Sequence, residues 1–596
     1  MKKYFPILIL AIFILSGLVE IGNSEVNIKK NIIKETINFS NPLIEECDQY
    51  STINLKEATS SLMKIGGPVL PVFTKKYILP FGSKIYSIEI ISSEIYEINL
   101  NKEIEHASKP EILDYKTKES QESGEIKIND IYKSNQLYPL ESFNYSIRTG
   151  LLENKHVTYL TLQLYPIKLS PVQNRIFFSK YFDIIVIYED LSEPLKIEDK
   201  YDMVIITPNN FSIELEPLVK HKNSHGIDTF IKPVEEIFAS YNGKDNIEDI
   251  KLFIKDAIEN YNISYVLLCG SIYKIPIRIS NVILWDWKAY PPTDLYYSDI
   301  YDSEGNFSSW DTNNNNLFGE TNQDVFDLCP DVHIGRLACD RIGEVKIVID
   351  KIINYEKKTQ RENWFTNMIF LGGDTHFLGN YEGEEHNSLV MEIMSNFNPI
   401  TIWTSIGNFN KKTISEAINS GAGFLDYSGH GFENGIGTYL PDSDKLQTYH
   451  TRNIKYLRNG YKLPIIFLSA CLTAKLDFVL KDLLDYQEYE ILKFLNIIPG
   501  FVENYKLPSF AWSLVNYKDG GSIASIGATR IAYENENFGA IKLSEEFFRS
   551  YENSITLGQM LTKAQNSYIS EIPNDELTVE EFILLGDPSL KVGGYY

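Results

Sequence analysis

The sequence predicts an α/β protein with a mostly parallel sheet, preceded by a β-rich region, and two patterns of hydrophobicity predict this fold. Up to about residue 198, apolar and polar residues alternate over short stretches such as 157–165, which is the period of a half-buried strand. From residue 199 on, continuous apolar runs such as 265–269 and 465–469 alternate with stretches of helical spacing such as 247–261. Buried strands separated by helices are typical of a parallel sheet that is covered on both faces.

Residues 1–24 are predicted to be a secretory signal peptide. Lys2 and Lys3 precede an apolar run at 7–19, and small residues follow at 22–24. This order of basic start, short apolar stretch and small residues is that of a cleavable signal. The alternative is an uncleaved membrane anchor, although the run is shorter than the ~20 residues that a span needs. The rest of the sequence has no segment that is long and apolar enough to span a bilayer, so we expect a secreted, extracellular protein.

The remaining chain divides into three predicted segments. Residues 25–198 are the β-rich region, and its acidic end at 189–200, which contains Pro194, is expected to be an exposed joint. The α/β part then divides into a first half at 199–358 and a second half at 359–596.

Composition argues against several classes of function. The chain has 56 Lys and Arg against 80 Asp and Glu, which gives a formal net charge of −24. Because nucleic-acid binding depends on clustered Lys and Arg, we expect no nucleic-acid partner. The 5 cysteines are scattered and form no CxxC pair, which argues against a disulfide scaffold and against a cysteine zinc site.

Three predicted strands of the second half are followed by reactive side chains, namely Asp374, His430 and Cys471. In parallel sheets, chemistry takes place beyond the carboxyl ends of the strands. The sequence between His430 and Cys471 is long enough for one crossover between neighbouring parallel strands, which takes ~30 or more residues. We therefore expect these side chains to meet at one edge of the sheet.

Each of the three residues also has an ordinary structural explanation. A cysteine at the end of an apolar run is often a small buried hydrophobe, a histidine beside glycines is often a turn residue, and an aspartate after Gly-Gly can be a helix cap. Together they favour chemistry, because Cys and His form a known pair of nucleophile and acid/base that a carboxylate can orient.

The motifs around two of these residues resemble a known family. Tyr-Ser-Gly-His-Gly at 427–431 and Phe-Leu-Ser-Ala-Cys at 467–471 are similar to the His and Cys motifs of the gingipain-type cysteine peptidases, in the caspase-like fold group. Further stretches that agree with the family lie at 201–208, 332–336, 521–527 and 585–592. The resemblance spans about 200–596 and implies a caspase-like α/β/α sandwich with mostly parallel sheets, preceded by a β-rich prodomain.

The same resemblance implies a cysteine endopeptidase that acts on proteins or peptides. Cys471 would be the nucleophile that forms a thioester, and His430 the acid/base. Asp374 would be the carboxylate that holds the histidine, although gingipains proper carry Glu at this place. The backbone N–H groups of Gly431 and Cys471 would form the oxyanion hole. The chemistry needs no cofactor.

A zymogen is also implied. Residues 25–198 would be a prodomain that inhibits its own enzyme until the joint at 189–200 is cut, with Lys196 and Lys200 as candidate sites. Two rival functions remain open: a transpeptidase or peptide ligase, which passes the thioester to an amine, and a non-catalytic binding homologue on the same fold.

Two residues align with the pocket for the residue before the cut. Glu384 falls where Arg-cutting gingipains carry an acidic side chain, which would select Arg or Lys. Arg530 falls close to a pocket-lining aromatic of those enzymes, and if it points inward it neutralises Glu384 or favours Asp. Alternatively, Glu384 is simply a carboxylate in the first turn of a helix. The alignment favours basic residues.

A structural Ca²⁺ is consistent with one loop of the first half. Its oxygen-bearing residues lie around Gly305 and are Asp299, Asp302, Asn306 and Asp311. The family resemblance agrees with calcium, and an ordinary solvated acidic loop explains the same residues equally well.

Overall fold

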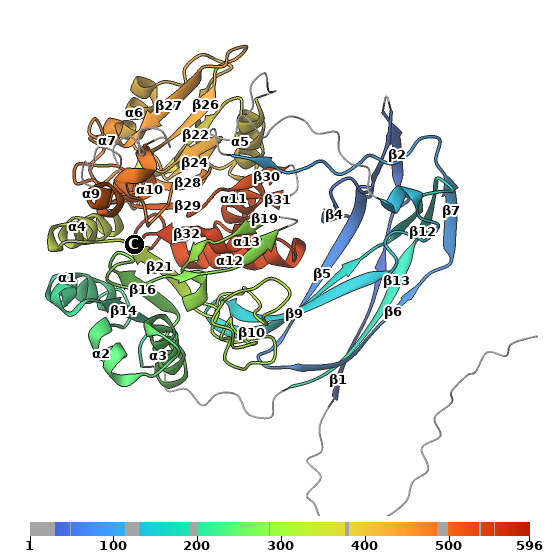
Figure 1. Cartoon of the computed structure of the whole chain (residues 1–596), viewed down its shortest axis with the longest axis horizontal. Helices are drawn as coiled ribbons and strands as arrows, with labels where there is room; N and C mark the ends of the chain where they lie inside the picture. The colour runs from blue at the N-terminus through green and yellow to red at the C-terminus, as the bar shows by residue number, and fades with distance from the viewer. Residues whose placement is uncertain are drawn as a thin grey trace, which may run out of the picture.

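The computed structural model describes residues 30–47, 49–113, 130–190, 200–284, 287–375, 379, 381–484, 499–535, 538–552 and 555–595. The predicted signal peptide lies outside these residues. Within the described part, no helix is long and apolar enough to cross a membrane. The chain forms a β-rich N-terminal region, blue to cyan in Figure 1, and a larger α/β region, green to red.

Antiparallel sheets build the N-terminal region. In sheet order, their strands are β1 (Lys30–Asn38), β13 (Tyr181–Glu189) and β6 (Lys84–Ser92); β4 (Ser60–Leu62), β5 (Leu70–Pro80), β10 (Lys155–Leu164) and β9 (Phe143–Leu152); β11 (Ile167–Ser170), β12 (Arg175–Ser179) and β7 (Ile95–Asn99); and the pair β2 (Leu43–Glu46) and β3 (Ser51–Asn54). The alternating leucines of β10, namely Leu160, Leu162 and Leu164, are fully buried in the core of this region, which confirms the predicted strand.

The second face of β10 is also covered, whereas its alternating pattern predicted a solvated face. On this side the sheet packs through β5 and β9 on helix α12 (Leu557–Glu571) of the α/β region. The Gln163 side chain donates a hydrogen bond to the carbonyl oxygen of Glu571 at 2.9 Å, and Lys76 of β5 donates one to the carbonyl oxygen of Asn566 at 3.3 Å. Gln163 and Lys76 therefore form hydrogen bonds with the α/β region on this face.

A single ten-stranded sheet runs through the α/β region. Its strands, in order across the sheet, are β15 (Thr229–Pro233), β14 (Met203–Thr207), β16 (Tyr265–Cys269), β21 (His333–Leu337), β32 (Phe582–Leu585), β29 (Ala524–Ala528), β28 (Ile465–Ser469), β24 (Phe424–Ser428), β22 (Asn367–Gly372) and β23 (Asn398–Trp403). Neighbouring strands are parallel except for β29 and β32. The two predicted halves join where β21 meets β32, so the sheet is continuous across them.

The helix predicted at 247–261 in the first half forms, and local end signals fix its bounds. Helix α3 (Asn246–Tyr261) begins after Asp245, whose side chain accepts hydrogen bonds from the backbone N–H groups of Ile247 and Glu248. It ends at Asn262, which adopts a left-handed conformation with φ 59°. The apolar face of this helix is buried against the sheet, as the helical spacing predicted.

Helices cover both faces of the sheet, which makes the region a three-layered sandwich (Figure 1). One layer contains α5 (Glu382–Ile393), α11 (Ala540–Arg549) and α12, which pack on one another. The opposite layer contains α1 (Ser212–Asn223), α4 (Ile342–Lys358) and α10 (Phe510–Val515), with α7 (Thr451–Ile454) beside α10. Further helices are α2 (Val234–Ser240), α6 (Lys411–Ser420), α9 (Pro499–Asn504) and α13 (Glu576–Glu581).

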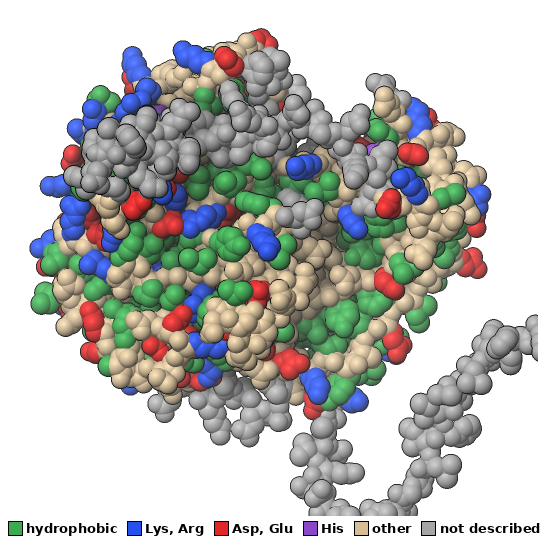
Figure 2. Space-filling model, in the orientation of Figure 1, with side chains coloured by type: hydrophobic (Ala, Val, Ile, Leu, Met, Phe, Trp, Pro, Cys, Tyr) green, Lys and Arg blue, Asp and Glu red, His purple; other side chains and the backbone are tan. Residues whose placement is uncertain are grey.

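One strand of the N-terminal region crosses over to the α/β region. Strand β8 (Glu111–Ile112) pairs antiparallel with β30 (Tyr533–Asn535), which also pairs with β31 (Phe538–Gly539). In Figure 1 a blue strand reaches from the N-terminal region to β30. Figure 2 shows the two regions as lobes with a hollow between them, and acidic and basic side chains are spread over both.

Candidate active site

The three predicted strand ends lie side by side. His430 follows β24 by two residues, and Cys471 follows β28 by two residues. These strands are parallel neighbours, paired through to Ser428 and Ser469. β22 lies on the other side of β24, and Asp374 follows its end. All three side chains therefore start from the same edge of the sheet, which is the arrangement that the strand pattern predicted.

Glycines allow the chain after β24 to pack against Cys471. A Cβ atom at Gly431 would lie 2.2 Å from the Cys471 carbonyl oxygen and 2.9 Å from the Cys471 nitrogen, so no side chain fits there. Gly429 has φ 149°, and a Cβ atom there would lie 2.7 Å from the hydroxyl oxygen of Tyr427. Gly431 is thus required by a close backbone contact, and Gly429 by its positive φ and the nearby Tyr427 hydroxyl.

Tyr427 holds the turn that carries His430. Its hydroxyl oxygen lies 2.8 Å from the carbonyl oxygen of His430 and 2.7 Å from that of Gly437, and accepts a hydrogen bond from the Gly437 N–H at 3.0 Å. Gly437 belongs to β26 (Gly435–Tyr439), which pairs with β25 (His430–Phe432) and β27 (Leu446–His450). Sequence analysis missed this role, although Tyr427 stands inside the histidine motif.

The Cys471 thiol faces the backbone of a neighbouring segment. Its Sγ atom lies 3.2 Å from both the nitrogen and the carbonyl oxygen of Ala532. The next residue, Leu472, has φ 56°, which is uncommon for a residue with a side chain, and its N–H donates to the Arg530 carbonyl oxygen at 2.8 Å. The chain therefore leaves β28 in a sharp turn at the cysteine.

An extended segment of the N-terminal region lies across this site. Leu113 follows β8, and its N–H donates a hydrogen bond to the carbonyl oxygen of Ala532 at 3.0 Å. Its own carbonyl oxygen accepts one from the Gly431 N–H at 3.3 Å and lies 3.0 Å from Nδ1 of His430. A peptide carbonyl is thus bound between the predicted oxyanion-hole residue and the predicted acid/base, a contact that sequence analysis missed.

Asp374 is linked to His430 through Tyr439. Its Oδ1 atom accepts a hydrogen bond from the Tyr381 N–H at 2.7 Å, and its backbone carbonyl oxygen accepts one from the Tyr439 N–H at 2.9 Å. The Tyr439 ring packs edge-on against the His430 imidazole, with ring centroids 5.5 Å apart. Burial raises the pKa of Asp374, and the hydrogen bond from Tyr381 partly offsets this rise. The role of Asp374 as the carboxylate that holds His430 stays a prediction.

Glu384 and Arg530 have separate partners. Glu384 lies in the first turn of α5, and its carboxylate accepts hydrogen bonds from the Thr404 hydroxyl at 3.1 Å and the Ser405 N–H at 2.9 Å. Arg530 binds both carboxylate oxygens of Asp477, at 2.9 and 2.7 Å. The structure therefore pairs Arg530 with Asp477, and not with Glu384. Their roles in substrate binding stay predictions.

The residues considered for calcium make hydrogen bonds within the protein. Buried Asp299 accepts hydrogen bonds from the Trp310 indole at 2.9 Å and the Leu328 N–H at 3.1 Å. Asp302 accepts one from the Asn306 N–H at 2.9 Å. Among the described residues, the structure has no group of three or more His, Cys, Asp or Glu side chains that could hold a metal ion.

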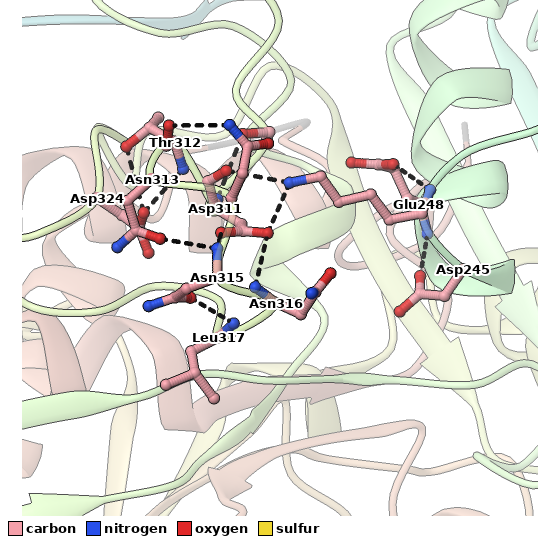
Figure 3. A network of polar contacts seen from close by, with 12 residues as sticks. Asp245, Glu248, Asp311, Thr312, Asn313, Asn315, Asn316, Leu317 and Asp324 are labelled. Carbon is pink, nitrogen blue, oxygen red and sulfur yellow. Dashed lines mark hydrogen bonds and ion pairs between the residues drawn. The ribbon is translucent and has the colours of Figure 1, made fainter.

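Asp311 has its own counter-ion. Its carboxylate accepts hydrogen bonds from the backbone N–H groups of Asn315 at 2.9 Å and Asn316 at 3.2 Å (Figure 3). Lys244 forms an ion pair with it at 2.6 Å. This contact ties the loop to the start of α3, where Figure 3 shows Asp245 and Glu248.

A family model matches most of the α/β region. The model of Peptidase family C25 matches residues 196–593, which is more than half of the chain. The chain belongs to this family. This confirms the resemblance that the His and Cys motifs indicated, and it agrees with the predicted caspase-like α/β/α sandwich and its preceding β-rich region. The exact boundaries of the predicted segments stay predictions.

The chain is similar to curated proteins of Porphyromonas gingivalis. It is 24% identical to Gingipain R2 over 443 residues, which cover 71% of this chain and 51% of that protein. It is 21% identical to Lys-gingipain W83 over 342 residues, which cover 56% of this chain and 16% of that protein. The chain thus spans about half, or less, of the length of these relatives.

Two solved structures are similar to part of this chain. The crystal structure of the Arg-specific cysteine proteinase gingipain R is 21% identical, with a TM-score of 0.49, and the match covers 67% of this chain and 80% of that one. A complex of the pro- and mature domains of RgpB from Porphyromonas gingivalis is 22% identical, with a TM-score of 0.48, covering 66% and 79%.

Proposed function

We propose that the chain is a secreted cysteine endopeptidase that hydrolyses peptide bonds through a thioester on Cys471, with His430 as the acid/base. One observation carries the proposal. The carbonyl oxygen of Leu113 accepts a hydrogen bond from the Gly431 N–H and lies 3.0 Å from Nδ1 of His430. The same residue donates its N–H to Ala532, whose backbone contacts the Cys471 thiol. These contacts support binding of the attacked carbonyl of a substrate at the same place.

The geometry supports a stepwise reaction. As the sulfur of Cys471 bonds to the carbonyl carbon, its proton passes to His430, and the carbonyl oxygen becomes an oxyanion. The oxyanion faces the N–H groups of Gly431 and Cys471, and losing one such donor typically costs on the order of 10²–10³ in rate. His430 then protonates the leaving amine as the C–N bond breaks, and water hydrolyses the thioester.

Asp374 is proposed to position His430. Its backbone binds Tyr439, whose ring packs against the imidazole, so the aspartate stabilises the surroundings of the acid/base. An orienting group of this kind fixes the direction in which the histidine presents its nitrogens.

The N-terminal region is proposed to keep the enzyme latent. Strand β8 pairs with β30, and Leu113 takes up the contacts that a substrate needs, so the site is blocked while this segment is bound. Activation then requires a cut that frees the segment. The proposed joint at 189–200 lies almost wholly outside the described residues, including Lys196, while the Lys200 N–H donates to the Tyr261 carbonyl oxygen at 3.3 Å.

Two further proposals come from the sequence. Secretion is supported by the basic and apolar pattern of residues 1–24. A structural Ca²⁺ near Asp299 and Asp311 is proposed from the number of oxygen-bearing side chains in that loop. A lower melting temperature in excess EGTA than in CaCl₂ would support calcium, and identical melting temperatures would contradict it.

Substitution of Cys471 tests the proposed function. The full-length chain is cut with trypsin at the joint, the trypsin is quenched, and hydrolysis of fluorogenic peptides is measured. Cys471→Ala should abolish hydrolysis and keep the native circular dichroism spectrum. Cys269→Ala is the matched control, because Cys269 is also buried at the end of a strand, and it should remain active. Full activity of Cys471→Ala would contradict the proposal. Peptide products joined to an added amine would indicate the ligase instead.

A further inference from the structure

We propose that this site selects leucine, or an uncharged aliphatic residue of similar size, immediately before the bond that it cuts. The inference rests on the proposed peptidase function and names its substrate class. It starts from Leu113, which the structure binds in the manner of a substrate and whose side chain is fully buried.

The backbone contacts fix which residue precedes the cut. In a cysteine peptidase the attacked carbonyl is the one held by the oxyanion-hole donors. Among the contacts of β8 and the residue after it, the carbonyl oxygen bonded to the Gly431 N–H belongs to Leu113. The preceding residues Ile112 and Glu111 pair with Tyr533 and Glu534. Leu113 therefore occupies the position of the residue before the cut, and Ile112 and Glu111 occupy the two positions before it.

The side chain of Leu113 lies in an apolar environment. Among the described residues, Leu113 is the one fully buried side chain of the N-terminal region that joins the main hydrophobic core of the α/β region. Every other buried member of that cluster comes from residue 203 onward. Its neighbour Ile112 is only partly buried. The side chain of the residue before the cut is thus shielded from solvent and joins the apolar core of the α/β region.

The charged residues predicted for this pocket are already engaged. The Glu384 carboxylate accepts hydrogen bonds from Thr404 and Ser405, and Arg530 forms its two-pronged ion pair with Asp477. The ion pair with Asp477 compensates the charge of Arg530, whereas the uncharged donors of Thr404 and Ser405 hold the Glu384 carboxylate in place without cancelling a negative charge. Because burying a charge in the apolar core that Leu113 joins is costly, Lys, Arg and Asp should all be disfavoured at the place of Leu113.

A peptide series tests the preference directly. The substrates are acetyl-Glu-Ile-X-aminomethylcoumarin with X as Leu, Ala, Lys, Arg or Asp, which copies residues 111–113, and the enzyme is the trypsin-cut chain after trypsin is quenched. We expect kcat/KM for Leu to exceed every other value at least about tenfold, since a few methylene groups in an apolar pocket give such ratios. Faster cleavage after Lys or Arg, or after Asp, would overturn the leucine preference and leave the peptidase function standing. If no peptide is cut, the peptidase function itself fails.

Latency of the uncut chain gives an independent readout. Leu113→Ala and Leu113→Lys should each raise the basal hydrolysis rate of the full-length chain at least about tenfold, because the blocking segment loses its pocket contact. Leu140→Ala is the matched control, since Leu140 lies in the same region and is 64% exposed, and it should leave the rate unchanged. A Leu113→Lys chain that is as latent as the wild type would show that the pocket accepts a basic side chain. The peptide series decides the question if these variants fail to fold.

Discussion

Replacing Gly431 with alanine should disable the site while leaving most of the fold in place. The added Cβ atom would lie 2.2 Å from the carbonyl oxygen of Cys471 and 2.8 Å from Cβ of Ala470. Real Cβ atoms keep at least about 3 Å from such backbone atoms, so the Gly431 and Cys471 segments must move apart by about 1 Å. A misplacement of about 1 Å can cost about 10²-fold in rate, and loss of an oxyanion donor costs on the order of 10²–10³.

We therefore expect kcat of Gly431→Ala to fall on the order of 10²–10³-fold, with a cost of about 1–3 kcal/mol in the free energy of unfolding from overpacking. The assay is hydrolysis by the trypsin-cut chain, with urea denaturation for stability. Gly343→Ala is the control, because Gly343 lies exposed in α4 and a Cβ atom there meets nothing within 4 Å. Activity of Gly431→Ala within about threefold of the wild type would refute the role of this backbone contact in transition-state stabilisation.

Two further predictions concern titratable residues near the site. His430→Ala should lower kcat by at least about 10²-fold through loss of the acid/base. The control is His225→Ala, at a partly buried histidine in the turn after α1, which should stay active; equal rates for the two variants would contradict the assignment. Burial raises the pKa of Asp426 in β24 to about 7, although Asn387 and Ser544 donate hydrogen bonds to it. The pKa of Asp426 in the folded chain lies above the unfolded value of about 3.9, so protonated Asp426 stabilises the fold fully below about pH 4. This contribution to the free energy of unfolding is lost as the pH rises toward 7. Asp426→Asn should therefore lose less stability than the wild type between pH 5 and pH 8 in urea titrations, and an unchanged pH dependence would contradict this.

The strand ends could be predicted from the sequence because hydrophobic periodicity is local. The apolar run before Cys471 and the run before His430 each identify a buried strand, and parallel neighbours end at the same edge. The glycines beside His430 permit a close backbone approach, and the structure places Gly431 against Cys471.

Contacts between distant segments could not be predicted in the same way. Leu113 and Ala532 meet because two regions dock, and no periodicity within either segment encodes that pairing. The same holds for the partners of Glu384 and Arg530, which depend on where the Thr404 turn and Asp477 lie in the folded chain. Alignment with a family predicts which type of residue stands at a position, whereas the groups that this residue binds are set by tertiary packing.

The central claim is that Cys471 is the nucleophile of a site built to bind a peptide like residues 111–113. The most direct test treats the trypsin-cut chain, after trypsin is quenched, with acetyl-Glu-Ile-Leu chloromethyl ketone and maps the adduct by mass spectrometry. We predict a single adduct, on Cys471, and slower labelling of the uncut chain, in which Leu113 occupies the site. An adduct on another cysteine, or equal labelling of a Cys471→Ser chain, would contradict the account.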